Sequence, residues 1–216
     1  MPEVSPDRPV QPGWDAIIAH QLKTPLCAMD AKLSSTEKVD RVHLRRDIRR
    51  LTRLIDQLQL VARCRDDRAG RRELVPLGTA VRDIVSELAP IAFDARLSMM
   101  FRNFGRNCTI QGDPILIGEA IRNVIENAIK YSPPGGTIVV VVTARGRVYV
   151  LDRGPGVAVA DTEAVFEPFR RGVTQKPGSG LGLFLVREIM RRENGTATIL
   201  MRRGGGSAAF LRFERG

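Results

Sequence analysis

Apolar residues recur at helical spacing over residues 14–66. The pattern breaks once, where the hydroxyl residues 34–36 precede Glu37 as a helix N-cap would. The second arm carries apolar residues at alternating steps of four and three, which is typical of a coiled-coil seam: Leu44, Ile48, Leu51, Ile55, Leu58 and Ala62. The pattern predicts a helical hairpin. Because one hairpin cannot enclose such a seam, we expect a homodimer through residues 14–66 that forms a four-helix bundle.

Helical and strand patterns mix from Glu73 onward. Three stretches carry an apolar face at helical spacing: 78–94, 114–131 and 181–193. Four stretches have strand character and pair across short turns, 137–143 with 147–152 and 196–201 with 207–213. Together they predict an α/β sandwich, a mixed sheet layered with helices on one face, and not a doubly wound Rossmann sheet. The expected fold class of the whole chain is α+β.

Two segments without apolar periodicity divide the chain. Residues 1–13 hold four prolines and are interpreted as a leader or a linker stub. Residues 67–72 are polar, contain a glycine and predict an interdomain linker. We therefore expect a helical domain over 14–66 and a second domain over 73–216. A length of 216 residues with 43% hydrophobic content is sufficient for two small cores.

The composition excludes several classes of protein. A net charge of +10 would suit nucleic acid, but aromatic residues make up only 5% of the chain, and single-strand binders interleave basic with aromatic side chains. We assign the charge to solvation or to an acidic protein partner. The longest apolar run is far shorter than the roughly 18 residues that a membrane span needs, so we expect no membrane segment. Cys27, Cys64 and Cys108 are interpreted as packing residues in a reducing compartment.

A glycine-rich loop, GSGLGL at residues 178–183, runs directly into a predicted helix. Its backbone amides and the positive end of the helix dipole would suit phosphate oxygens. The loop lacks the Lys and Ser or Thr of a Walker motif, and it does not follow a strand as a Rossmann fingerprint does. Since glycine turns before helices are common, a phosphate site and a plain turn both stay open.

A carboxylate, Asp152, ends a predicted strand and is followed by Gly154 and Gly156. Such a carboxylate can accept a hydrogen bond from an exocyclic amine, and the glycines let a ligand lie against bare backbone. Adenine carries an amine where guanine carries a carbonyl, so Asp152 would select adenine. The same pattern also describes an ordinary turn.

The segment NVIENAIKY places Asn123, Asn127 and Lys130 on one face of a predicted helix. Amide oxygens suit Mg²⁺, and lysine supplies a point charge for a phosphate. Asparagine is a poor helix former, and a bound metal and nucleotide would justify two of them in one helix.

The ordered series NVIENAIKY, DRGPG, FEPF and GSGLGL resembles the asparagine, first glycine, phenylalanine and second glycine boxes of the sensor histidine kinases, members of the Bergerat-fold ATPase superfamily. AHQLKTPL, at residues 19–26, resembles the family's phosphoacceptor motif, usually written HExxTPL. The resemblance covers roughly residues 14–213, and the joint order of five motifs is highly specific. It implies a Bergerat ATP-binding fold, ATP and Mg²⁺ as cofactors, and a response regulator receiver domain as partner.

The resemblance also implies roles for individual residues. His20 corresponds to the phosphorylated histidine, Asn127 to the asparagine that holds Mg²⁺, and Asp152 to the carboxylate that reads adenine. Arg170 and Arg171, just past FEPF, are candidates for phosphate contacts or, equally, solvated surface charges. The remaining nucleotide-site positions are Asn123, Lys130, Tyr131, Gly154, Gly156, Phe166, Phe169, Gly178, Gly180, Leu181 and Gly182.

The phosphoacceptor motif departs from the family pattern at Gln21, where most members carry Glu or Asp. In the family that acid is thought to take the imidazole proton; an amide cannot, although its oxygen can hold the ring in one tautomer. Thr24 matches the residue that orients water for dephosphorylating the partner. We therefore expect slow kinase activity and a balance shifted toward phosphatase.

The chain is thus expected to be a dimeric ATP-dependent protein-histidine kinase core. It would autophosphorylate His20, pass the phosphoryl group to an aspartate of a response regulator and also dephosphorylate that partner. Two other functions stay open: a histidine phosphotransfer protein with a degenerate second domain that does not bind ATP, and a pure ATPase of the gyrase or chaperone type. Asn123 disfavours the ATPase, because it stands where hydrolytic relatives carry a glutamate base. The expected location is cytoplasmic, as a short soluble kinase or as part of a membrane-anchored receptor.

Overall fold

The computed structural model describes residues 14–34, 41–65, 72–105, 107–170, 176 and 179–214. The chain divides into two compact units, Met1–Ile55 and Asp56–Gly216. The boundary falls inside a helix, ahead of the linker that the sequence predicts at residues 67–72. The last turns of that helix therefore belong to the second unit.

Two helices, α1 and α2, begin the chain. α1 spans Trp14–Ser34 and α2 spans Arg41–Arg65, so the two predicted helical arms are confirmed. The predicted N-cap before Glu37 lies outside the described residues. On α2, Ile48 and Ile55 of the seam expose 50% and 41% of their surface. The seam is therefore only partly covered within a single chain.

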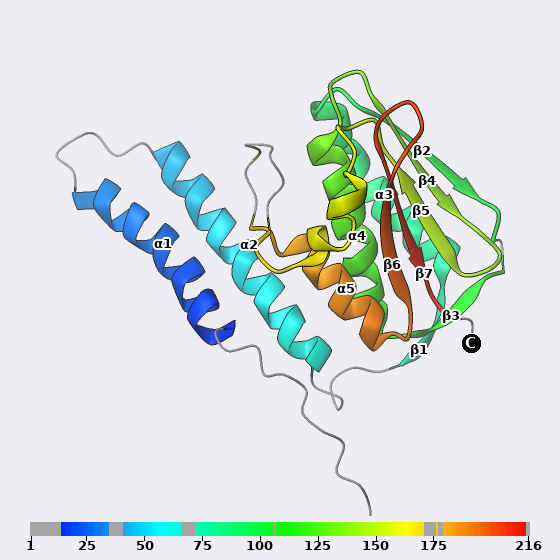
Figure 1. The fold of residues 1–216 in the computed structure, drawn as a ribbon, viewed down its shortest axis with the longest axis horizontal. Coiled ribbons are helices and arrows are strands. Elements are labelled where there is room, and N and C mark those ends of the chain that lie inside the picture. Colours follow the sequence, from blue (N-terminus) through cyan, green and yellow to red (C-terminus); the bar gives the residue numbers. More distant parts are fainter. Residues whose placement is uncertain are drawn as a thin grey trace, which may run out of the picture. The chain divides into compact units, whose positions relative to one another are not determined.

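The second unit is built on a five-stranded mixed sheet (Figure 1). In the order β2-β4-β5-β7-β6, the strands span Ser98–Asn103, Thr137–Val142, Arg147–Leu151, Ser207–Arg212 and Thr196–Met201. β2 pairs with β4 in parallel, and the other neighbouring strands pair antiparallel. The two hairpins predicted from the sequence, β4 with β5 and β6 with β7, are confirmed.

The sequence pattern misses three strands. β1 (Glu73–Pro76) and β3 (Thr109–Gly112) form a separate antiparallel pair of only four residues each, too short for a clear alternation. β2 lies at the edge of the large sheet, and its side chains alternate between exposed and half-buried. Because β2 has no fully buried row of side chains, hydrophobic alternation does not reveal it.

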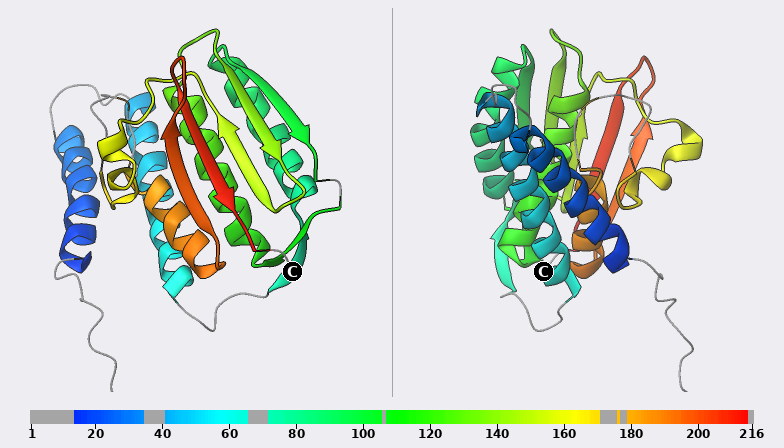
Figure 2. Two further views of the ribbon diagram at one scale, coloured as in Figure 1. Left: turned by 45° about the vertical axis from the view of Figure 1, so that its right-hand side comes forward. Right: turned by 90° about the vertical axis from the view of Figure 1, so that its left-hand side faces the viewer.

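Three helices of the second unit cover one face of the large sheet (Figure 2), as predicted. They are α3 (Leu77–Asp94), α4 (Pro114–Tyr131) and α5 (Gly182–Arg192). β4 buries Ile138, Val140 and Val142 at alternate positions, because only one sheet face meets these helices. Two short 3₁₀ turns, Val159–Asp161 and Ala164–Phe166, lie between β5 and α5. The predicted α+β architecture is confirmed.

The packing interpretation of the cysteines is correct for two of the three. Cys64 and Cys108 are buried, and burial raises the pKa of the Cys64 thiol to about 12, which keeps it protonated. Cys27 is exposed on α1, so for this residue the interpretation was wrong. The hydrophobic spacing of α1 could not reveal this, because the face that carries Cys27 finds no covering side chains within the described chain.

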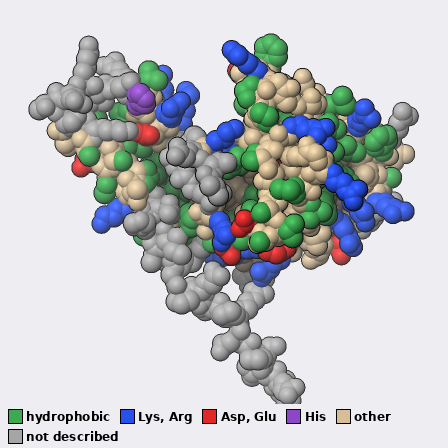
Figure 3. All heavy atoms as spheres, turned by 45° about the horizontal axis from the view of Figure 1, so that its top comes forward, with side chains coloured by type: hydrophobic (Ala, Val, Ile, Leu, Met, Phe, Trp, Pro, Cys, Tyr) green, Lys and Arg blue, Asp and Glu red, His purple; other side chains and the backbone are tan. Residues whose placement is uncertain are grey.

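Basic side chains occupy many separate places on the molecular surface. Figure 3 shows Lys and Arg side chains spread over several elements of the face drawn, with few Asp and Glu among them. This spacing agrees with assigning much of the net charge of +10 to solvated surface positions. Across the described ranges, no helix combines the length and apolar character that a membrane span requires.

Candidate nucleotide site

The asparagine box and the second glycine box meet in the second unit. α4 carries Asn123 and Asn127 one helical turn apart, and both side chains face the first residue of α5. A Cβ atom on Gly182 would lie 3.0 Å from Asn123 Oδ1 and 3.9 Å from Asn127 Nδ2. Glycine at this position lets α5 begin directly against the two amides.

The two asparagines differ in their surroundings. Asn123 is 5% exposed, donates from Nδ2 to the Glu119 carbonyl at 2.8 Å, and accepts at Oδ1 from Gln57 Nε2 at 3.4 Å. Asn127 is half-buried, and its side chain makes no hydrogen bond with any residue that the structure describes. Asn127 therefore keeps its amide oxygen available to a ligand.

The donor set suits Mg²⁺ better than a transition metal. Within the described ranges, no group of three or more His, Cys, Asp and Glu side chains could hold a metal ion. Mg²⁺ needs few protein ligands because it retains water and substrate phosphate oxygens. The open amide oxygen of Asn127 fits such a role.

The end of α4 contacts the first glycine box. Lys130 Nζ lies 4.7 Å from the centre of the Tyr131 ring, and the Lys130 carbonyl accepts a hydrogen bond from Lys176 Nζ. A Cβ atom on Gly154 would lie 2.9 Å from the Tyr131 carbonyl oxygen. Glycine at position 154 thus allows the loop after β5 to pack directly on the backbone of α4.

Backbone donors hold Asp152 in one orientation. The carboxylate is 7% exposed, and its Oδ1 accepts from the Gly154 N–H at 2.7 Å and from the Ser207 N–H at 3.0 Å. Oδ2 receives no hydrogen bond from the part of the chain that the structure describes. One carboxylate oxygen is therefore used to fix the side chain, and the other remains an acceptor for a ligand donor.

The phenylalanine box packs against the second glycine box. Phe166 is buried, and the Arg187 guanidinium lies 5.9 Å from the centre of its ring. The Phe169 backbone has a φ of +60° and lies against Gly180, where a Cβ atom would come within 2.7 Å of the Phe169 carbonyl carbon. Because Gly180 itself has a φ of +76°, both close approach and conformation favour glycine at this position.

Neighbouring loop residues complete the boxes. Leu181 is fully buried, and its N–H donates to Ser179 Oγ at 3.2 Å. Gly156, with a φ of +81°, lies close to the Gly206 carbonyl oxygen, which a Cβ atom would approach to 3.1 Å. The contact of Gly156 joins the loop after β5 to the turn between β6 and β7.

The two arginines after FEPF differ in what the structure describes. Arg170 pairs with Asp161 at 3.1 Å and with Glu167 at 3.0 Å, and the hydrogen bond to Glu167 raises the pKa of the Arg170 guanidinium. A phosphate contact from Arg170 would require it to leave these carboxylates. Arg171 and Gly178 lie outside the described residues.

The phosphoacceptor motif lies on α1, in the first unit. His20 and Gln21 are helical, and their side chains lie outside what the structure describes. Thr24 is exposed one helical turn after His20. The motif is thus carried by one unit and the four nucleotide boxes by the other.

The sequence interpretation missed Gln57, which contacts both Asn123 and Ser179. Gln57 is 7% exposed, although it lies off the predicted seam of α2. A signal was present in the sequence, because Gln57 falls at helical spacing within a second stripe of apolar residues, all of which are buried: Leu54, Val61 and Cys64. A glutamine in such a stripe indicates a buried polar partner.

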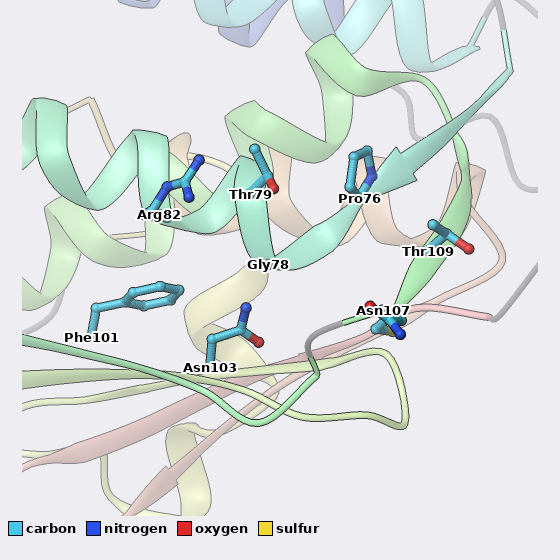
Figure 4. Close-up of a pocket in the computed structure, with 9 residues that line it drawn as sticks. Pro76, Gly78, Thr79, Arg82, Phe101, Asn103, Asn107 and Thr109 are labelled. Atoms are coloured by element: carbon cyan, nitrogen blue, oxygen red, sulfur yellow. The ribbon is translucent and has the colours of Figure 1, made fainter.

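A cavity of about 350 Å³ lies elsewhere, between the start of α3 and β2 (Figure 4). Its lining includes the polar side chains of Thr79, Arg82, Asn103, Asn107 and Thr109. It contains none of the residues that the motifs single out, so the boxes do not coincide with this cavity.

Comparisons with known proteins agree with the boxes. Residues 112–216 match the family described as histidine kinase-, DNA gyrase B-, and HSP90-like ATPase. The sensor protein QseC of Salmonella typhi is 33% identical in an alignment 211 positions long, which covers 90% of this chain and 46% of QseC. The sensor-like histidine kinase SenX3 of Mycobacterium tuberculosis is 31% identical in an alignment 213 positions long, which covers 91% of this chain and 52% of SenX3. The chain spans about half the length of the curated relatives it matches.

The fold is likewise shared with solved structures. A structure of the histidine kinase ThkA in complex with the response regulator protein TrrA has a TM-score of 0.77 and 16% identity. The match covers 96% of this chain and 62% of the ThkA chain. From the boxes and these similarities, the chain belongs to the sensor histidine kinases, with an ATPase domain in its second unit.

Proposed function

We propose that this chain is the core of a two-component kinase that autophosphorylates His20 from Mg-ATP and transfers the phosphoryl group to an aspartate of a response regulator. ATP use follows from the ATPase domain. The single observation that supports particular residues concerns unpaired polar groups. Asp152 Oδ2 and the Asn127 amide have no hydrogen-bond partner among the described residues, whereas Asp152 Oδ1 and the Asn123 amide are hydrogen-bonded. These two groups would bind adenine and the metal-phosphate end of the nucleotide.

The chemical step needs little from the protein beyond positioning and charge neutralisation. One imidazole nitrogen of His20 attacks the γ-phosphorus, a P–N bond forms, the P–O bond to ADP breaks, and the other ring nitrogen gives its proton to solvent, because the Gln21 amide cannot accept it. Lys130 would offset phosphate charge. A Mg²⁺ ion held by Asn127 would supply further charge neutralisation.

Two further parts of the proposal concern partners. The partly exposed seam of α2, including Ile48 and Ile55, supports a homodimer through residues 14–66, because an apolar seam is stabilised by partner helices. The structure of ThkA with TrrA shows a protein of this fold in complex with a response regulator, which supports a response regulator as the partner of this chain.

The proposal is tested by incubating the chain with Mg²⁺ and ATP labelled in the γ-phosphoryl group. A phosphohistidine label survives base and is lost in acid, whereas a phosphoserine label has the opposite behaviour. Added response regulator should then remove the label. Calorimetry that detects no ATP binding would instead favour the histidine phosphotransfer protein with a degenerate second domain.

The side chain at position 21 is expected to limit the kinase rate. Gln21→Glu should raise the initial rate of autophosphorylation by about tenfold or more, because a carboxylate can take the imidazole proton and general-base help is worth roughly 10²- to 10⁴-fold. Gln59→Glu adds the same charge at an exposed position of α2 and serves as the control. An unchanged or lower rate in Gln21→Glu would remove the assigned role.

The hydroxyl at position 24 is expected to serve dephosphorylation. Thr24→Ala should lower the rate at which the chain dephosphorylates its phosphorylated partner by about tenfold, since a correctly oriented water is lost. Autophosphorylation of the same variant should stay near the wild-type rate. Phosphatase activity that survives Thr24→Ala intact would contradict this role.

Arginines on α2 are expected to recruit the response regulator. Arg46 and Arg49 are exposed, and Arg50 follows on the same helix. Reversing the charge of all three to Glu should slow phosphotransfer about tenfold at low salt, with a smaller difference at high salt, because steered encounters weaken with ionic strength. The same reversal at exposed Arg145 and Arg203 of the second unit is the control. Phosphotransfer insensitive to salt and to the first three reversals would exclude this surface.

A further inference from the structure

A side-chain bridge ties the end of α2 to the candidate nucleotide site. Gln57 Oε1 accepts a hydrogen bond from Ser179 Oγ at 2.7 Å, and Gln57 Nε2 donates to Asn123 Oδ1 at 3.4 Å. We name this pair of hydrogen bonds the Gln57 bridge. All three residues belong to the second unit, Asp56–Gly216. One amide group thus contacts the asparagine box and the second glycine box at once.

The two amide groups of the bridge are shielded from solvent, and Ser179 is half-buried. Gln57 and Asn123 are 7% and 5% exposed, and Asn123 Nδ2 is already used by the Glu119 carbonyl. Gln57 Nε2 occupies one of the two lone pairs of Asn123 Oδ1. Because both residues are buried, a ligand that approaches this oxygen must displace the Gln57 amide. Asn127, one turn further along α4, is half-buried and carries no such competitor among the described residues.

The hydroxyl group of Ser179 is also engaged in hydrogen bonds. Its hydroxyl donates to Gln57, and its oxygen accepts from the N–H of Leu181, a residue that is fully buried just before α5. While the hydroxyl proton points to Gln57, it cannot be donated to a phosphate oxygen. The bridge therefore occupies polar groups from two of the four boxes.

An independent set of contacts fastens the end of α2 that follows Gln57. Arg63 pairs with Asp113 at 2.7 Å, and Asp113 in turn caps the N-terminus of α4. Arg192, at the end of α5, donates to the carbonyls of Arg63 and Cys64 at 2.9 and 3.2 Å. Residues 56–65 are thereby held against both helices that bound the site, and this holds Gln57 in reach of Asn123.

We infer that the Gln57 bridge is an inhibitory latch on the nucleotide site, released when Mg-nucleotide takes over Asn123 and Ser179. Gln57 acts here as a positioning residue. Because one amide group makes both hydrogen bonds, withdrawal of the Gln57 side chain would free both boxes together. This inference rests on the proposed nucleotide site and adds to it a specific intramolecular competitor.

The test is calorimetric titration of the full chain with a non-hydrolysable ATP analogue and Mg²⁺, using wild type and Gln57→Leu. Leucine is similar in size and suits the apolar stripe around it. The substitution removes the Gln57 donor from Asn123 Oδ1, and this loss affects the nucleotide-free state only, because in the bound state the Mg-nucleotide is expected to contact that oxygen. The analogue should bind about fivefold to thirtyfold more tightly, which is the expected effect of losing two hydrogen bonds from the competing state. The gain should be smaller without Mg²⁺.

Gln59→Leu is the matched control, because Gln59 is an exposed glutamine on the same helix. Its affinity for the analogue should equal that of wild type. A merely structural role of Gln57 would lower the unfolding temperature of Gln57→Leu and leave its affinity unchanged or weaker, and either affinity result overturns the latch. An equal gain in Gln59→Leu overturns it too. Wild type that binds no analogue would instead mean that the proposed function fails.

Exchange of backbone amides supplies a second readout in the wild-type chain. If the bridge opposes binding of the analogue, binding of the analogue must equally weaken the bridge. Adding the analogue with Mg²⁺ should therefore speed hydrogen exchange of the backbone amides of residues 57–61 about severalfold. Slower or unchanged exchange in this segment, together with measurable binding of the analogue, would overturn the latch while leaving the nucleotide site in place.

Discussion

His20→Ala is expected to abolish labelling of the chain by the γ-phosphoryl group of ATP. The imidazole is the only nucleophile that the proposal uses, so its removal should reduce incorporation by roughly a thousandfold or more, to background. The measurement is acid-labile, base-stable label after incubation with Mg²⁺ and ATP. Binding of an ATP analogue should be unchanged, because the nucleotide residues belong to the second unit and His20 to the first.

The chain supplies a matched control for this experiment. It contains two histidines, and His43 is exposed on α2, outside any motif. His43→Ala should therefore keep the wild-type label. Label that persists at the wild-type level in His20→Ala, or that disappears in His43→Ala, would show that His20 is not the phosphoacceptor.

Asp152→Asn is expected to lower the affinity for ATP by about a hundredfold or more, because a site built around a hydrogen bond strongly rejects the wrong partner. The two N–H groups of Gly154 and Ser207 require an oxygen at the Oδ1 position, so the introduced asparagine must place its NH₂ group where Oδ2 now lies. That NH₂ group would face the amine of adenine, donor against donor.

The design of this variant separates binding from folding. Because the introduced asparagine can keep both backbone hydrogen bonds, the unfolding temperature should change little while calorimetry shows the loss of ATP affinity. The ratio of GTP to ATP affinity should rise, since the new NH₂ group can donate to the carbonyl of guanine. Asp94→Asn, at an exposed position at the end of α3, is the control and should bind as wild type. Unchanged ATP affinity in Asp152→Asn would mean that Asp152 does not read the base.

Much of the fold could be predicted because the signals were local. α4 occupies the predicted range 114–131, since Asp113 caps it, Pro114 opens it and its apolar face is periodic. β4 and β5 are adjacent in sequence and joined by a short turn, so their pairing needed no distant information. The edge strand β2 was missed because its side chains are exposed or half-buried and leave no clear hydrophobic alternation; its parallel pairing with β4 is visible only in the structure.

The candidate site divides in the same way. The glycines and asparagines of the boxes were recognisable because their roles depend on residue type: an absent Cβ at Gly180 and Gly182, an amide oxygen at Asn127. Arg170 was left open between a phosphate contact and a surface charge, and its pairing with Asp161 and Glu167 depends on how the loop folds back.

The helical arms, the two hairpins and the order of the boxes could all be predicted from local patterns, and so could the residue types that are candidates for binding a nucleotide. These follow from periodicity, turn residues and the chemistry of single side chains, which act over a few positions. Which of these polar groups lack a partner among the described residues depends on contacts between distant parts of the chain. Asn123 and Asn127 look alike in the sequence. Among the described residues, Gln57 forms a hydrogen bond with Asn123 and none forms one with the side chain of Asn127. Asn123 is buried, and because an unpaired buried amide is costly, it requires a partner, which comes from a distant part of the chain.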